Sequence, residues 1–231
     1  MTTSSVKPFT SVLKPRKEVL EGRIIEALSL ADAYIANELR GRVEGVESLP
    51  ESPLYEPKEF LKRTYFSESM KRVLLNVMGS LAGVQYLYKD KEGRDKFKVQ
   101  SRVLVIPSHL GGGKTHLLTT LYFVAKLVNE EGAHALRYLE VDDKTRNALK
   151  HAIDVLVQAG RKIQVVALVG DRKYLAPSPL NPVTVDGVRV NTPWGLLAHL
   201  LQEYDKVRVR DESFAAPFTD EIKKVLQDKT V

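Results

Sequence analysis

Residues 102–116 decide the predicted fold and read Arg-Val-Leu-Val-Ile-Pro-Ser-His-Leu-Gly-Gly-Gly-Lys-Thr-His. The apolar run at residues 102–107 has the composition of a strand buried on both faces, which is typical of a parallel sheet. Three glycines follow, and residues 115–129 then repeat leucine and valine at helical spacing. A strand, a glycine cluster and a helix in this order form the context in which a phosphate-binding loop is expected.

The chemistry of this loop fits a nucleoside triphosphate. Glycines let the backbone turn its N–H groups toward an anion, and the start of the following helix adds partial positive charge. Lys114 supplies a full charge for the β- and γ-phosphates, and the Thr115 hydroxyl is placed to hold Mg²⁺. We therefore predict ATP and Mg²⁺ as ligands. The predicted phosphate-binding residues are Ser108, His109, Leu110, Gly111, Gly112, Gly113, Lys114, Thr115 and His116.

One position departs from the usual phosphate-loop pattern, in which a glycine begins the loop. Ser108 stands at that position in this chain, so a small polar residue makes the first turn. The alternative interpretation is a glycine-rich turn with a chance Gly-Lys-Thr, but the flanking strand and helix favour the nucleotide site.

The order of elements after residue 102 predicts the fold class. Residues 163–170 form a second buried-type strand, and strands alternate with helices from residue 102 onward, which indicates an α/β fold. We expect a parallel sheet of the P-loop NTPase type, flanked by helices and preceded by a mostly helical N-terminal region. The predicted organisation is a flexible arm at residues 1–16, a helical region at 17–83 and a nucleotide-binding core at 84–231.

Local patterns predict the remaining elements. Serine and threonine residues that precede apolar stripes, at Ser67 and Thr192, indicate helix starts, and Asp186-Gly187 indicates a two-residue hairpin turn. The predicted helices span residues 17–39, 58–62, 68–83, 115–129, 144–159, 193–204 and 219–226, with hairpins in 84–100 and 183–190 and a short strand at 136–139.

Hydrolysis would need an acidic residue at the end of a buried strand, to organise Mg²⁺. Asp171 follows the strand at 163–170 and is one candidate metal ligand, although an arginine rather than a glutamate comes next. The pair Asp142 and Asp143 is the other candidate. Both sets could instead be ordinary strand-end or helix-capping acids, so catalytic residues and ATPase activity stay open, and the carboxylate could lie outside this chain.

Composition excludes several classes of protein. The 231 residues contain no cysteine, which excludes disulfides, cysteine-based zinc sites and thiol catalysis. No run of about 18 apolar residues occurs, so we expect no membrane partner and a cytoplasmic location. The net charge of +6 permits DNA or RNA as a partner without requiring it. Abundant Lys, Arg and Glu with little Asn and Gln indicates a protein from a hot environment.

Several segments together resemble a known family. These are residues 59–66, residues 108–116, residues 167–171 and the run Asp-Gly-Val-Arg-Val-Asn-Thr-Pro-Trp-Gly at 186–195, although Pro193 stands where a bulky apolar residue is expected. From about residue 17 to 205 the chain is similar to the predicted archaeal and bacterial ATPases catalogued as domain of unknown function 499. The resemblance implies a large P-loop ATPase, of a kind found encoded beside DNA-modification and phage-resistance functions.

The resemblance also implies an incomplete core. The strand at 163–170 would be the second parallel strand, and the acidic strand would follow the helix that ends near Leu226. Three functions stay open: an ATP-binding module of a larger or truncated ATPase, a nucleic-acid-binding protein that uses nucleotide as a switch, and a nucleotide-binding regulatory or scaffold domain without hydrolysis. Further domains of the same ATPase, or further copies of the chain, are expected partners.

Overall fold

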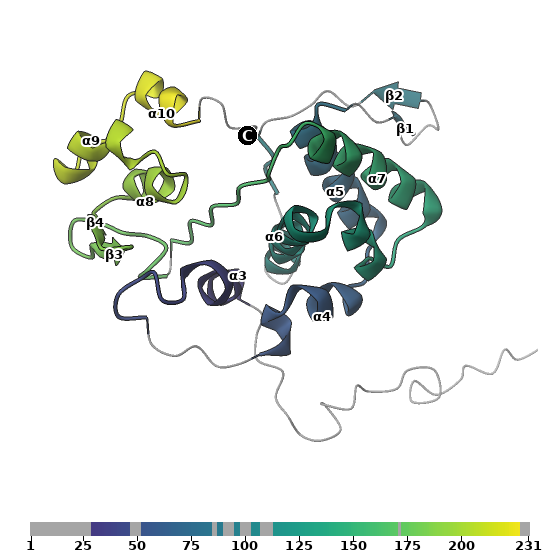
Figure 1. The fold of residues 1–231 in the computed structure, drawn as a ribbon, viewed down its shortest axis with the longest axis horizontal. Helices are drawn as coiled ribbons and strands as arrows, with labels where there is room; N and C mark the ends of the chain where they lie inside the picture. The colour runs from purple at the N-terminus through teal and green to yellow at the C-terminus, as the bar shows by residue number, and fades with distance from the viewer. Residues whose placement is uncertain are drawn as a thin grey trace, which may run out of the picture.

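The computed structural model describes residues 29–46, 52–84, 87–89, 95–97, 103–106, 113–170 and 172–226. Helices dominate these residues, and long helices pack against one another without a central sheet (Figure 1). In chain order, the helices are α3 (Leu30–Tyr34), a π-helical turn (Ile35–Leu39), α4 (Pro57–Lys62), α5 (Glu68–Ala82), α6 (Lys114–Glu131), α7 (Asp143–Gln158), α8 (Pro193–Leu200), α9 (Arg208–Glu212) and α10 (Thr219–Leu226). Short 3₁₀ helices lie at Pro53–Tyr55, Gly132–Tyr138 and Tyr204–Lys206.

The strands form two separate hairpins. β1 (Leu87–Lys89) pairs antiparallel with β2 (Asp95–Phe97), and β3 (Val183–Val185) pairs antiparallel with β4 (Val188–Val190). In the second hairpin, Val183 lies opposite Val190 and Val185 opposite Val188. Asp186 and Gly187 at the turn both have positive φ, as the Asp-Gly pattern predicts for a two-residue connection.

The predicted parallel sheet of the P-loop NTPase type, flanked by helices, is wrong. Among the described residues, the strands form two antiparallel hairpins, and Val43 adds one isolated antiparallel bridge to Val185 of β3. Residues 103–106 and 161–169 are not helical, and neither segment is paired as a strand. An apolar run predicts an extended segment whose side chains are buried, but it does not predict which element packs against that segment. Helices α5, α6 and α7 supply that cover for one another, and residues 136–139, predicted as a strand, lie in and just after a 3₁₀ helix.

The helix starts predicted from Ser67 and Thr192 are confirmed, but α8 ends at Leu200 rather than near Tyr204, and α9 was not predicted. The Ser67 hydroxyl accepts a hydrogen bond from the Met70 N–H at 3.3 Å and begins α5. The Thr192 hydroxyl accepts one from the Gly195 N–H at 3.1 Å and begins α8. Of the helix predicted at residues 17–39, the structure describes only residues 29–39, and their last turn is a π-helix.

The core lies between the long helices and the elements packed beside them. Phe60 of α4 and Phe123 of α6 are buried and meet edge to face, with ring centroids 5.2 Å apart. Leu74 of α5 and Leu149 of α7 are also fully buried in the same cluster. Each such side chain contributes about 1.5–3 kcal/mol through burial. Together these buried side chains form a packed core beside α6, the helix that follows Gly113 (Figure 1).

Candidate phosphate-binding site

Of the predicted phosphate-binding residues, the last four are described. Gly113 precedes α6, Lys114 and Thr115 are its first two residues, and His116 is the third. Ser108, His109, Leu110, Gly111 and Gly112 lie outside the described residues, as does the candidate metal ligand Asp171.

Among the residues that the structure describes, no side chain caps the start of α6. The N-cap residue is Gly113, which has no side chain that could accept a hydrogen bond from the helix. Its φ of 76° is a left-handed conformation that residues with a Cβ rarely adopt. The helix is 18 residues long and has no acidic residue in its first turn. The first backbone N–H groups of a helix lack intrahelical partners and carry partial positive charge. An anion is therefore favoured at this end of α6.

Lys114 and Thr115 place polar side chains at the same end. Lys114 is half-buried and Thr115 is exposed. Behind them, the buried Thr119 hydroxyl donates to the Thr115 carbonyl at 2.8 Å, and the buried Thr120 hydroxyl donates to the His116 carbonyl at 2.7 Å. Both bonds come from buried threonines of the same helix, whereas Thr115 itself is exposed.

α4 holds the first turn of α6 in place. The His116 ring lies against the Phe60 ring, with centroids 4.8 Å apart, and Phe60 is buried. Burial lowers the pKa of His116 below its ordinary value, so the imidazole is neutral at pH 7. His116 therefore acts as a packing residue here, and the charge at the site comes from Lys114 and the helix.

The middle of α6 is anchored to the N-terminal segment. The Tyr122 hydroxyl and the Lys126 ammonium both donate to one carboxylate oxygen of Glu38, at 2.8 and 2.9 Å. Tyr34 packs beside Tyr122, and burial together with the Glu38 charge raises the pKa of Tyr34 to about 12. Both hydroxyls are therefore protonated donors at neutral pH: the Tyr122 hydroxyl ties α6 to Glu38, and the Tyr34 hydroxyl donates to the Val165 carbonyl.

The candidate acid Asp142 has the contacts of a helix cap. Its carboxylate accepts from the Thr145 N–H and the Thr145 hydroxyl, each at 2.9 Å, and it begins α7. It also pairs with Lys71 of α5 at 2.9 Å. These contacts hold its pKa well below the ordinary range, with the Lys71 bond as the largest cause. In the described part of the chain, no group of three or more His, Asp or Glu side chains could hold a metal ion.

Sequence reasoning missed one buried polar centre. Asp211 of α9 is completely buried and accepts hydrogen bonds from the Asn191 N–H at 3.0 Å, the Thr192 hydroxyl at 2.5 Å and the Tyr204 hydroxyl at 2.8 Å. A Cβ at Gly195 would overlap this carboxylate. The available signal was Gly195 itself, because a glycine inside a helix costs about 1 kcal/mol relative to alanine and needs a packing reason.

Fold and site together define a predominantly helical domain in which the 18-residue helix α6 begins at a left-handed glycine and has no acid in its first turn. The family model of the DUF499 N-terminal domain matches residues 16–231, so the chain belongs to this family. Searches of curated proteins and of solved structures gave no match to this chain. Within the described ranges, every helix is too short or too polar to cross a membrane.

Proposed function

We propose that this chain is a nucleoside-triphosphate-binding module that works with further domains of an ATPase. The β- and γ-phosphates bind at the start of α6, where Lys114 supplies the full charge and Thr115 the hydroxyl for Mg²⁺. The observation that carries the proposal is the uncapped start of this 18-residue helix, preceded by a left-handed glycine and free of acids in its first turn. The matching family model is that of an N-terminal domain, which supports a role alongside other domains.

Binding without turnover is the expected behaviour of the chain alone. Hydrolysis needs a carboxylate that orders Mg²⁺ and water, and Asp142 is already engaged by Thr145 and Lys71. The proposal therefore separates two measurements. Titration with ATP measures binding, and release of inorganic phosphate measures turnover.

The test is titration of a fluorescent ATP analogue in the presence of Mg²⁺ against the full chain and two lysine variants. Lys114→Ala removes the charge at the start of α6 and should weaken binding at least 100-fold. Lys144→Ala is the matched control, because Lys144 is an exposed lysine in the first turn of α7, where Asp142 already caps the helix. Its affinity for ATP should equal that of the parent chain.

Two outcomes would overturn the proposal. One is unchanged ATP affinity in Lys114→Ala. The other is equal loss in the two lysine variants, which would show that ATP responds to the overall charge of the surface. Circular dichroism and the melting temperature of each variant establish that both chains are folded.

A further inference from the structure

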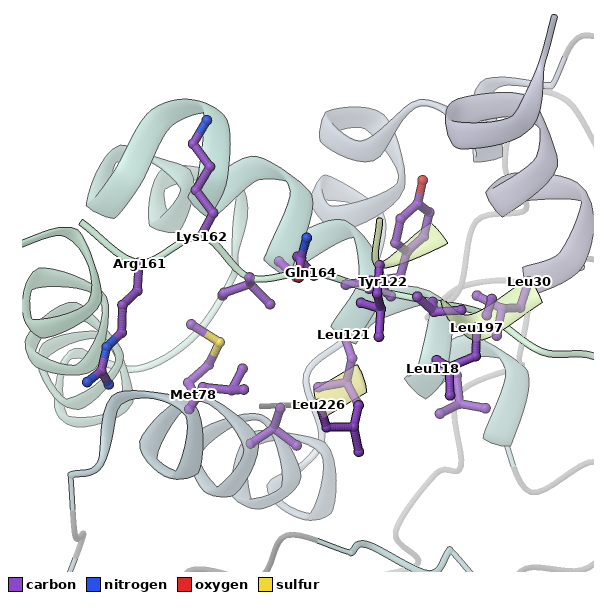
Figure 2. Close-up of a pocket in the computed structure, with 18 of the residues that line it drawn as sticks. Leu30, Met78, Leu118, Leu121, Tyr122, Arg161, Lys162, Gln164, Leu197 and Leu226 are labelled. Atoms are coloured by element: carbon purple, nitrogen blue, oxygen red, sulfur yellow. The ribbon is translucent and has the colours of Figure 1, made fainter. Parts of the chain in front are cut away.

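The connection between α7 and the second hairpin is a long extended segment, at residues 161–169, that runs past α6 (Figures 1 and 2). One edge of its backbone is hydrogen-bonded. The Ile163 N–H donates to Asn129 Oδ1 at 2.8 Å, and the Ile163 carbonyl accepts from Asn129 Nδ2 at 2.7 Å. The Val165 carbonyl accepts from the Tyr34 hydroxyl at 2.9 Å. The Val169 N–H donates to the Leu175 carbonyl at 3.3 Å.

The other edge is open. In an extended chain, backbone groups of successive residues point to opposite edges, so residues 162, 164 and 166 face away from Asn129 and Tyr34. Within the part of the chain that the structure describes, the backbone groups of Lys162, Gln164 and Val166 make no hydrogen bond. A row of unpaired N–H and C=O groups is a template for another strand.

An apolar cavity of about 720 Å³ lies beside this segment (Figure 2). Aliphatic side chains of α5 and α6 form much of its wall, and α8, the residue that follows it and α10 contribute the others. These side chains are Val77, Met78, Leu81, Leu118, Leu121, Ala125, Leu197, Leu201 and Leu226. A cavity of this size and character has room for the side chains of one face of a short strand.

Charge is present at only one end of the cavity wall. Arg161 and Lys162 are the charged residues among those that line it, and no acidic residue lines it. Figure 2 shows Arg161 at the end near Met78, opposite to Leu30 and Leu118, while Lys162 points away. Arg161 is exposed, so a carboxylate on an occupant could pair with it.

We propose that residues 162–166 accept an added β-strand from a partner polypeptide, an extended aliphatic segment with a carboxylate at the end beside Arg161. The strand's backbone pairs with the open edge, and its aliphatic side chains fill the cavity, which is how strand addition combines affinity and specificity. This surface is distinct from the start of α6 and does not depend on nucleotide binding.

The experiment uses two synthetic seven-residue peptides of alternating valine and threonine, labelled with fluorescein. One carries aspartate at its first position and the other at its last, and fluorescence anisotropy measures their binding to the full chain. We expect one peptide to bind, and its identity gives the direction of pairing. Replacing its aspartate by lysine should weaken binding at least tenfold. Methylating alternate backbone nitrogens, which removes the N–H donors, should do the same.

A charge exchange tests the assigned end of the cavity. Arg161→Glu should weaken binding of the aspartate peptide at least tenfold and restore binding of the lysine peptide. Lys144→Glu on α7 should change the binding of neither peptide. Failure of both aspartate peptides to bind, or equal binding of the N-methylated peptide, would overturn the proposal. Lys114→Ala should leave peptide binding unchanged and Arg161→Glu should leave ATP binding unchanged, so the two proposals fail separately.

Discussion

Helices α6 and α7 follow one another in the chain and have similar lengths, 18 and 16 residues, but they begin in opposite ways. α7 begins at Asp142, whose carboxylate satisfies the Thr145 N–H, and Asp143 adds a second acid to the first turn. α6 begins at a left-handed glycine, with a lysine in its first turn and no acid. In the part of the chain that the structure describes, acids stand at the start of α7 and the first turn of α6 has none.

The different residues at the two helix starts indicate different roles for them. A helix needs an acceptor and negative charge at its start, and Asp142 provides both inside the folded chain. At α6, the first turn holds no acid, and Lys114 adds a full positive charge to the partial charge of the helix. In the function proposed above, the bound phosphates supply the negative charge at this helix start. α7 is therefore an internal control for α6: changes at α7 should affect stability, and changes at α6 should affect anion binding.

The strongest change gives α6 the charge that α7 already has. Gly113→Asp places a carboxylate at the start of α6, and we expect ATP binding to fall at least 100-fold because the carboxylate repels phosphate. No described residue lies within 4 Å of a Cβ at this position, although a φ of 76° costs about 1–2 kcal/mol. Titration of ATP with Mg²⁺ measures the effect.

Gly113→Asn is the matched control for that change, because asparagine has the same shape and tolerates positive φ but has no charge. It should lose tenfold or less in ATP affinity. Equal loss in the aspartate and asparagine variants would show that backbone geometry, not charge, makes the site.

A smaller effect on ATP affinity is expected when the Thr115 hydroxyl is removed. Thr115→Val removes the proposed Mg²⁺ ligand while keeping the shape of the side chain, so ATP affinity measured in Mg²⁺ should fall about tenfold, to the value measured in EDTA. Thr184→Val in β3 is the control, since valine suits a strand and this site is remote from α6 in sequence. A Thr115→Val chain that keeps its Mg²⁺ dependence would contradict the role given to this hydroxyl.

At α7, the corresponding change should act on stability alone. Asp142→Ala removes the cap of the Thr145 N–H and the ion pair with Lys71, so the melting temperature should drop by several degrees. ATP affinity should stay at the parent value, because α7 does not hold the phosphates. A loss of ATP binding in a folded Asp142→Ala chain would instead make this acid part of the nucleotide site.

The smallest effect is a dependence on pH. The pKa of Asp142 is lower in the folded chain than its unfolded value of about 4, so its contribution to stability is present above about pH 4 and is lost as pH falls below that. We expect the melting temperature of the parent to fall more steeply below pH 4 than that of Asp142→Asn. Parallel curves for the two chains would show that the folded and unfolded carboxyls titrate alike.

Local signals in the sequence predicted much of the fold. Ser67, Thr192 and the Asp186-Gly187 pair were read correctly because a cap or a tight turn depends on residues within three or four positions. The positions of Lys114 and Thr115 at a helix start were predicted for the same reason. The parallel sheet was wrong because a buried strand depends on its neighbours, and an apolar run carries no information about which segment lies beside it.

The sequence by itself determined where α6 begins and that a lysine and a threonine stand there without an acid. Only the tertiary structure decided that Asp142, besides capping α7 locally, also pairs with Lys71, 71 residues away in the chain. Tertiary structure likewise buried Asp211 against Gly195 and, within the described ranges, left one edge of residues 162–166 unpaired beside an apolar cavity. The physical reason is the distance along the chain over which each interaction acts. Caps and helix dipoles act within one turn, whereas the burial of a charge or the pairing of a strand edge depends on segments distant in sequence.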